Sequence, residues 1–317
     1  MTSDARLAVV AVGGNALIVD ESRKSIPDQF QAAAATTRSI VDLMESGWNV
    51  VITHGNGPQV GFILRRSELA MDEVPPVPMD YAVADTQGAI GYMFQRALHN
   101  EFTRRGIERE AATIVTQILV DRADPAFQNP TKPVGSYMDE TLARVRAADL
   151  GWAVKPEEAR GWRRVVPSPI PKAVIEIATI RRMIAADCAV IACGGGGIPV
   201  VEDQQGEYQG VEAVIDKDLA SSLMARELGA DLFIVSTAVE KVAINFNKPN
   251  QQWLDTLTLS DARRYYAAGE FGSGSMAPKV RAMIEFIEAT GKRGIITDPS
   301  NLAQAVKGTS GTHVVAK

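Results

Sequence analysis

Three glycine turns in this chain each follow a short apolar segment of the kind that forms a buried β-strand. Glycine allows a tight turn and lets backbone N–H groups approach an anion, because no Cβ stands in the way. In an open parallel sheet such turns meet at the carboxyl edge of the strands, where ligands bind. Together they predict one shared phosphate site. The turns are Gly13-Gly14-Asn15 after residues 7–12, Gly55-Asn56-Gly57 after residues 49–54, and Gly194 to Gly197 after residues 189–193.

Strand-like and helix-like segments alternate along most of the 317 residues, which indicates a doubly wound α/β fold with right-handed crossovers. The strands are short, continuous apolar runs, as expected for parallel strands buried on both faces. The length allows one large domain or two ordinary ones. The expected strands are residues 7–12, 49–54, 111–120, 189–193, 232–236, 294–297 and 312–315, and the expected helices are residues 27–45, 59–69, 84–105, 174–185, 218–227 and 278–289.

The alternation stops between about residues 121 and 168, where prolines are frequent. A connection of this length is uncommon in a compact domain unless it forms a lid or an inserted subdomain. Lys132 lies within it in the sequence Asn-Pro-Thr-Lys-Pro, and residues 139–148 form a charged, helix-like piece. We therefore expect a lid or subdomain here; a surface excursion without a function is the alternative.

Composition and charge argue against several classes of protein. The 46% hydrophobic and 22% charged residues are typical of a globular protein, and the net charge of −5 argues against nucleic acid as a partner. No secretory signal and no apolar run long enough to cross a bilayer are present, so we expect a cytoplasmic protein without a membrane partner. His54, His99 and His313 are far apart, which argues against a zinc site. Cys188 and Cys193 are expected to be buried thiols in a reducing compartment.

Two common nucleotide-binding motifs are absent from the sequence. A P-loop needs Gly, four residues and then Gly-Lys-Ser/Thr, and no such run occurs. The dinucleotide fingerprint G-x-G-x-x-G is also missing, because the spacing from Gly55 and Gly57 to Gly61 is one residue too long. The glycine turns therefore belong to another kind of phosphate site.

Two lysines stand at the beginnings of expected helices. Lys217 lies between Asp216 and Asp218, and Lys279 follows a Gly/Ser-rich loop. Each also has a plain structural interpretation, as a solvated ion pair at a capped helix or as a surface lysine. A cation in the first helical turn opposes the helix dipole, however, so a local anionic partner explains it better. Phosphoryl transfer needs positive charge beside backbone N–H groups, so the turns and lysines together suggest a kinase without a P-loop.

Nine ordered motifs, spread over essentially the full length, relate the chain to a known family. On these motifs it resembles the carbamate kinases of the amino acid kinase superfamily. Many superfamily kinases carry a lysine just before the first glycine turn, and Val12 in that place favours the carbamate kinases over the acetylglutamate and aspartate kinases. The motifs are VGGNAL (12–17), HGNGPQVG (54–61), QGAIGY (87–92), NPTKP (129–133), GWRRVVPSP (161–169), CGGGGIP (193–199), EAVIDKD (212–218), NFNKP (245–249) and MAPKV (276–280).

The resemblance implies a three-layer αβα sandwich around a mainly parallel open sheet, in a single domain of residues 1–317. It implies a protruding lid subdomain inserted over residues 121–168, and a homodimer. It also implies ATP or ADP as substrate with Mg²⁺, and reversible phosphoryl transfer between ATP and carbamate to give ADP and carbamoyl phosphate. The direction in the cell stays open between ATP formation, in arginine or purine breakdown, and the synthesis of carbamoyl phosphate.

The resemblance also implies roles for particular residues. No residue set is expected to hold a metal alone, because Mg²⁺ would bridge phosphates with few protein ligands. Ile170 stands where the family commonly has a basic residue, and whether Lys172 replaces it stays open. The expected catalytic residues are Lys132, Asp216, Lys217, Asp218 and Lys279; the expected substrate or phosphate ligands are Gly13, Gly14, Asn15, Gly55, Asn56, Gly57, Gly194, Gly195 and Gly196; the expected nucleotide ligands are Ser236, Thr237, Ala238, Val242, Phe271, Gly272, Gly274, Ser275 and Met276.

Two other functions stay open at this point. One is another small-acid kinase of the superfamily, and the other is a catalytically silent nucleotide-binding protein. The carbamate carboxylate is already anionic at neutral pH, so the proposed reaction needs no general base. His54 is therefore expected to shape the second glycine turn rather than transfer a proton.

Overall fold

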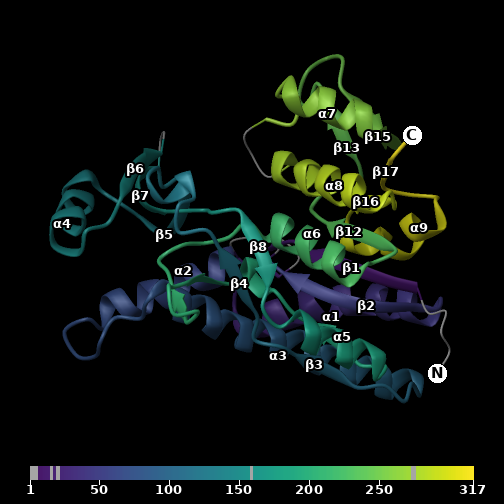
Figure 1. Ribbon diagram of the computed structural model, residues 1–317, viewed down its shortest axis with the longest axis horizontal. Helices are drawn as coiled ribbons and strands as arrows, with labels where there is room; N and C mark the ends of the chain where they lie inside the picture. The colour runs from purple at the N-terminus through teal and green to yellow at the C-terminus, as the bar shows by residue number, and fades with distance from the viewer. Residues whose placement is uncertain (1–5, 15–16, 19–21, 158–159, 273–275) are drawn as a thin grey trace.

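An eight-stranded sheet forms the centre of the computed structural model, which describes residues 6–14, 17–18, 22–157, 160–272 and 276–317. Its strands follow the order β15-β17-β16-β12-β1-β2-β9-β3, and every neighbouring pair is parallel except β16 and β17. The predicted α/β fold with a mainly parallel sheet is confirmed (Figure 1). The strands are β1 (Arg6–Val12), β2 (Trp48–His54), β3 (Ala111–Thr113), β9 (Ala189–Ile191), β12 (Leu232–Ser236), β15 (Thr256–Thr258), β16 (Gly294–Thr297) and β17 (Thr312–Val315).

Helices cover both faces of this sheet. In β1, Ala8, Val10 and Val12 pack in a core with α1, α3 and α9. The alternate residues Val9 and Ala11 pack in a second core with α5, α6, α7 and α8. Burial on both faces explains why the strands are continuous apolar runs in the sequence. The helices are α1 (Ile26–Glu45), α3 (Met79–Arg105), α5 (Ile177–Ala185), α6 (Lys217–Leu228), α7 (Leu259–Ala267), α8 (Met276–Thr290) and α9 (Leu302–Lys307).

A small α+β unit, called the protruding unit below, stands clear of the main sheet at the left of Figure 1. It consists of the antiparallel sheet β5-β7-β6 and helix α4, and lies within the predicted subdomain. Val134 and Val166 of this unit pack in one apolar cluster with Val60 and Leu64 of α2 (Gly57–Leu69). Its function as a lid stays a prediction. Its elements are β5 (Lys132–Met138), α4 (Glu140–Leu150), β6 (Val154–Glu157) and β7 (Gly161–Val166).

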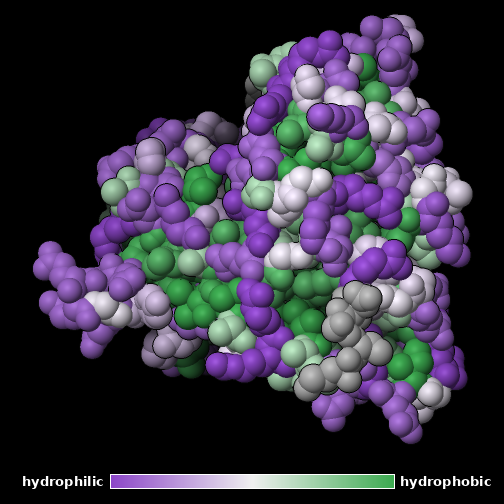
Figure 2. Space-filling view, turned by 45° about the vertical axis from the view of Figure 1, so that its right-hand side comes forward, coloured by the Kyte–Doolittle hydropathy of each residue, from purple (hydrophilic) through white to green (hydrophobic). Residues whose placement is uncertain are grey.

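Two further sheets complete the fold. One has four strands in the order β11-β10-β4-β8, and the other pairs β13 with β14. Among the described residues, no helix combines the length and apolarity needed to cross a membrane. Figure 2 shows one face of the molecule, with hydrophobic residues concentrated near its middle and hydrophilic residues over most of its edges. The remaining elements are β4 (Gln117–Val120), β8 (Pro171–Val174), β10 (Ile198–Glu202), β11 (Tyr208–Gly210), β13 (Val242–Ile244), β14 (Gln252–Leu254) and the 3₁₀ turns η2 (Pro125–Phe127), η3 (Gly194–Gly196) and η4 (Pro299–Asn301).

The predicted single strand over residues 111–120 is wrong. It is divided into β3, in the main sheet, and β4, in the four-stranded sheet. The break occurs where the N–H of Thr116 donates to Oε1 of Gln87 at 2.8 Å. A side chain of α3, the helix that precedes β3, thus takes the place of a strand partner, and the chain passes from one sheet to the other.

Three other element boundaries also differ from the sequence prediction. Val174 pairs with Ile118 as part of β8, so the helix predicted from residue 174 begins only at Ile177. Helix α3 begins at Met79, because Pro78 before it is extended and serves as the N-cap. The strand predicted to end at residue 193 ends at Ile191. Cys193 has a φ of 51°, which belongs to a turn and not to a strand.

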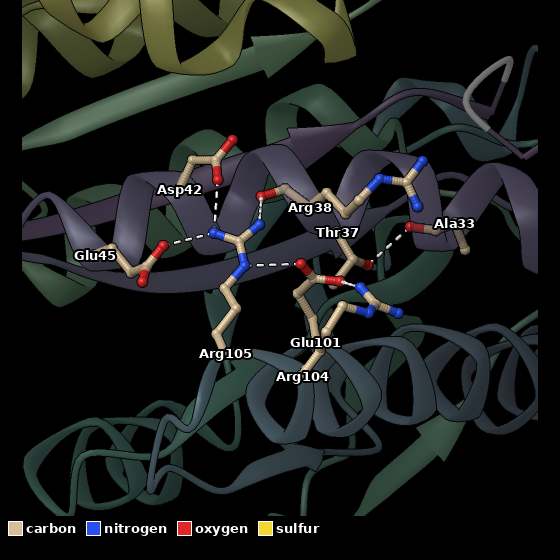
Figure 3. A network of polar contacts seen from close by, with 8 residues as sticks. All are labelled: Ala33, Thr37, Arg38, Asp42, Glu45, Glu101, Arg104 and Arg105. Atoms are coloured by element: carbon tan, nitrogen blue, oxygen red, sulfur yellow. Dashed lines mark hydrogen bonds and ion pairs between the residues drawn. The ribbon is translucent and has the colours of Figure 1, made fainter.

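Arg105 joins the C-terminal ends of α1 and α3 (Figure 3). Its guanidinium donates to Glu101 at 2.7 Å, to Asp42 at 2.6 Å and to Glu45 at 2.5 Å. Glu101 is almost fully buried, and Arg104 donates to its second carboxylate oxygen. A cation in the last turn of α3 also interacts favourably with the helix dipole. The network therefore fixes two helices that lie on the same face of the sheet.

Replacing Arg105 should destabilise the protein measurably. We expect Arg105→Met to lower the free energy of unfolding by about 1–2 kcal/mol, because a largely buried Glu101 loses a partner. Urea denaturation measures this change. Arg144→Met, which removes an exposed i,i+4 pair with Glu140, is the control and should cost less than about 0.5 kcal/mol. Equal effects of the two substitutions would contradict a stabilising role of the network.

Candidate phosphoryl-transfer site

The three glycine turns touch one another at the carboxyl edge of the main sheet. The N–H of Gly55 donates to the carbonyl of Val12 at 3.0 Å, and a Cβ on Gly55 would lie 3.0 Å from the backbone nitrogen of Gly14. A Cβ on Gly195 would lie only 2.1 Å from the Asn56 side-chain nitrogen. Their strands β1, β2 and β9 are neighbours in the sheet, which brings the turns together. Asn15 of the first turn lies outside the described residues.

Each of the four consecutive glycines occupies a place that excludes a side chain. A Cβ on Gly194 would lie 2.4 Å from the His54 ring, and one on Gly197 would lie 2.2 Å from Ile118. Gly195, Gly196 and Gly197 have positive φ angles of 67°, 95° and 84°, which favour glycine. A Cβ on Gly196 would meet the carbonyl of Ile215 at 2.4 Å. The turn is therefore packed against the residues that lead into α6.

Two lysines and one aspartate form a compact ionic cluster beside these turns. Nζ of Lys217 lies 2.7 Å from Oδ1 of Asp218, and Nζ of Lys279 lies 3.2 Å from Oδ2 of the same carboxylate. The lysines come from the first turns of α6 and α8, so both stand at helix N-termini. All three side chains are largely buried. One carboxylate between two ammonium groups leaves one formal positive charge on the cluster.

Asp218 is held in its ionised form. Burial raises the pKa of its carboxyl group, but the attraction and hydrogen bonds of Lys217 and Lys279 more than offset this, so the pKa is lowered. The carboxylate can therefore keep two like charges close together in the absence of a ligand. An anion that enters between the lysines would find positive charge already in place.

Asp216 and Lys132 connect the protruding unit to the beginning of α6. Asp216 is the N-cap of α6 and accepts hydrogen bonds from the N–H groups of Asp218 and Leu219. Its second carboxylate oxygen lies 3.0 Å from Nζ of Lys132, the first residue of β5. Lys132 is more exposed than the other two lysines. The structure thus brings all five residues predicted as catalytic into one region, where Asp216 is the partner of Lys132.

A cavity of about 440 Å³ lies beside α7 and the start of α8. Five of the residues predicted as nucleotide ligands line it: Thr237, Ala238, Phe271, Gly272 and Met276. Ser236 and Val242 are fully buried and are not among its lining residues, and Gly274 and Ser275 lie outside the described part of the chain. Such a volume suits a small organic ligand.

The cavity also has lining residues that were not among the expected nucleotide ligands, although Phe246 and Lys248 lie in the NFNKP motif. Phe246 and Trp253 stand edge to face at its rim, with ring centroids 6.5 Å apart. Lys241 and Lys248 supply positive charge, and Glu270 a carboxylate. Trp253 and Glu270 belong to no recognised motif and reach the cavity through the positions of β14 and the loop after α7. No local sequence signal could have identified them.

His54 is a buried, neutral residue beneath the turns. Its Nδ1 lies 3.2 Å from the Gly55 carbonyl, and its ring stacks on Phe94. Burial lowers the pKa of His54 to about 4, the hydrogen bond to Gly55 opposes this shift, and repulsion by Lys217 adds to it. An imidazole that is neutral and enclosed at pH 7 suits a structural role in the turn.

Both cysteines are buried, and the part of the chain that the structure describes contains no cluster of metal ligands. Cys188 and Cys193 are free and buried, which confirms the prediction of buried thiols. Burial raises the pKa of the Cys193 thiol, so it is protonated and a poor nucleophile. In the described ranges, no group of three or more His, Cys, Asp or Glu side chains could hold a metal ion.

Comparison with known proteins decides the family. Residues 6–298 match the amino acid kinase family. The chain belongs to this family. It is 46% identical to the carbamate kinase-like protein YahI of Escherichia coli over 312 residues, 98% of each chain, and 47% identical to the carbamate kinase of Pyrococcus horikoshii, with 96% of this chain and 98% of that protein covered. The solved carbamate kinase of Giardia lamblia bound to AMP-PNP matches this amino acid kinase with a TM-score of 0.94 at 40% identity, over 99% of both chains.

The buried state of His54 should make the stability of this amino acid kinase depend on pH. His54 has a pKa of about 4 in the folded protein and near 6.5 in the unfolded chain, which therefore takes up the proton first as the pH falls. The contribution of neutral His54 to the free energy of unfolding is present above about pH 6.5 and is lost progressively towards pH 4. About 2 kcal/mol of it is lost between pH 7 and pH 5.

Urea denaturation at these two pH values measures the effect. His54→Asn should reduce the difference between the two unfolding free energies by that amount. The same pH dependence in the wild type and the variant would show that His54 is accessible to protons in the folded state.

Proposed function

We propose that this protein is a carbamate kinase, which transfers a phosphoryl group reversibly between ATP and carbamate. The observation that carries the proposal is the pair of largely buried lysines held by Asp218 beside three touching glycine turns. Over nearly its full length, the chain is about as similar to relatives named carbamate kinase as it is to a relative named carbamate kinase-like. The identity of the acceptor therefore has to be tested directly.

The barrier to this reaction is repulsion between two anions, carbamate and the phosphate chain. In the proposal, Lys217 and Lys279 flank the transferring phosphoryl group, and Asp218 keeps their ammonium groups in place. Lys132 adds a third positive charge from the protruding unit. The first N–H groups of α2 have no partner within their own helix, and in the proposal they bind the anions together with N–H groups of the third glycine turn. Carbamate attacks through an oxygen that is already ionised, so no side chain has to remove a proton.

The nucleotide would occupy the cavity beside α7 and α8. Its base fits against the aromatic and apolar lining, with Phe246 and Trp253 at the rim. The phosphates would extend towards Lys279, which follows the lining residue Met276 at the start of α8. Mg²⁺ fits as an ion held mainly by phosphate oxygens and water, where it would neutralise phosphate charge, since the described residues offer no protein-built metal site.

We further propose a cytoplasmic homodimer. The two free thiols support a reducing compartment. Large hydrophobic side chains that are exposed near α2 and on α3, among them Leu69, Tyr81 and Tyr92, support an interface there. Light scattering should give about twice the chain mass of 34.1 kDa. Tyr92→Arg should lower it, and a monomeric wild type would contradict the dimer.

An assay of ATP formation from carbamoyl phosphate and ADP, with and without Mg²⁺, tests the function. Lys217→Ala should lower kcat by at least ~10², because one charge-stabilising group is lost. Lys132→Ala should lower kcat with little change in ADP affinity. Lys155→Ala, on an exposed part of β6, is the matched control and should leave both constants unchanged.

Three results would contradict the proposal, whether in this assay, in a panel of other acceptors or in measurements of nucleotide binding. Faster turnover with another small carboxylic acid in an acceptor panel would indicate a different kinase of the family. Tight ATP binding without turnover would indicate a silent nucleotide-binding protein. A large loss of ADP binding in Lys132→Ala would contradict the assignment of the protruding unit as a lid over the phosphoryl group.

A further inference from the structure

We propose that Thr86 and Gln87, neighbours on α3, are positioning residues that set the spacing between the second and third glycine turns. They would thereby set the size of the pocket that receives the acceptor. The inference rests on the proposed function, which assigns carbamate to these turns. Both side chains are 1% exposed, and each makes a hydrogen bond with a residue of a turn, Thr86 with Asn56 and Gln87 with Gly194.

Gln87 holds the third turn through its side-chain amide. Nε2 donates to the carbonyl of Gly194 at 3.1 Å and to the carbonyl of Thr116 at 3.1 Å, and Oε1 accepts from the N–H of Thr116 at 2.8 Å. The hydroxyl oxygen of Thr116 in turn accepts a hydrogen bond from the N–H of Cys193 at 3.0 Å. Gln87 therefore holds the chain at Gly194 directly and at Cys193 through Thr116.

Thr86 holds the second turn. Its hydroxyl donates to the carbonyl of Val83 at 2.7 Å, so its oxygen is left to accept the hydrogen bond from Nδ2 of Asn56 at 2.8 Å. The Asn56 amide therefore points its nitrogen, and not its oxygen, towards α3. The orientation of Asn56 within the turn thus depends on one hydroxyl group.

The two anchored turns are in direct contact with each other. Gly194 lies between the His54 ring and the side chain of Gln87, and Gly195 lies against the amide of Asn56. A long helix buried against the sheet thus holds both turns through two adjacent residues. Sites supported by helices are held more precisely than sites on loops alone, and a displacement of about 1 Å can cost ~10²-fold in rate.

The test uses substitutions of similar shape that remove hydrogen bonds. In Gln87→Met and Thr86→Val, we expect the KM for carbamoyl phosphate to rise at least ~10-fold, with the KM for ADP changed less than ~2-fold. Gln87→Glu should behave like Gln87→Met, because a carboxylate cannot donate to the Gly194 carbonyl. Selectivity for carbamoyl phosphate over the larger propionyl phosphate should fall by about 10-fold or more, the range in which one methylene is discriminated.

Gln29→Met is the matched control. Gln29 is an equally buried glutamine on α1 that bonds to Gln59 and Lys24. Its loss should lower the melting temperature without changing selectivity between acyl phosphates. If the variants at positions 86 and 87 lower the melting temperature but keep the wild-type selectivity and the wild-type ratio of the two KM values, their role is structural and the inference is wrong. A wild type that does not use carbamoyl phosphate would instead refute the proposed function, so the two failures can be told apart.

Discussion

The site depends on one interaction, in which the buried carboxylate of Asp218 holds the ammonium groups of Lys217 and Lys279. Without Asp218, Lys217 and Lys279 would repel each other in a place where water cannot screen them. With it, they stay within hydrogen-bond distance of one carboxylate and retain a net positive charge. The cost of arranging these charges is met during folding, so in the proposed function an arriving phosphate would need little reorganisation. A protein with a net charge of −5 would in this way attract anionic substrates at one place.

The parallel sheet supplies the rest of the site by bringing distant segments to one edge. Contacts continue from the first glycine turn to the second, from the second to the third, and from the third to Ile215 just before α6. Close packing at every step leaves no room for a Cβ at several of these glycines. The backbone of the turns and the cationic cluster are therefore joined by one continuous set of packing contacts.

The sequence predicted those parts of the fold that depend on local pattern. The strands around residues 7–12 and 232–236 are buried on both faces and are recognisable as apolar runs. Lys217 and Lys279 were recognisable because a cation opposes the dipole at the beginning of a helix. The division of residues 111–120 could not be predicted, because it depends on a hydrogen bond that the N–H of Thr116 donates to the side chain of Gln87 on another element. The nearness of Trp253 and Glu270 to the cavity likewise results from tertiary packing, which leaves no local signal.

A crystal structure of the protein with AMP-PNP and Mg²⁺ would test the central claim most directly. We expect Nζ of both Lys217 and Lys279 to lie within about 3 Å of oxygens of the terminal phosphate, as in other charge-assisted hydrogen bonds. Asp218 should still contact both lysines in that complex. A terminal phosphate bound elsewhere, with the two ammonium groups in contact only with Asp218, would show that the cluster stabilises the fold and takes no part in phosphoryl transfer.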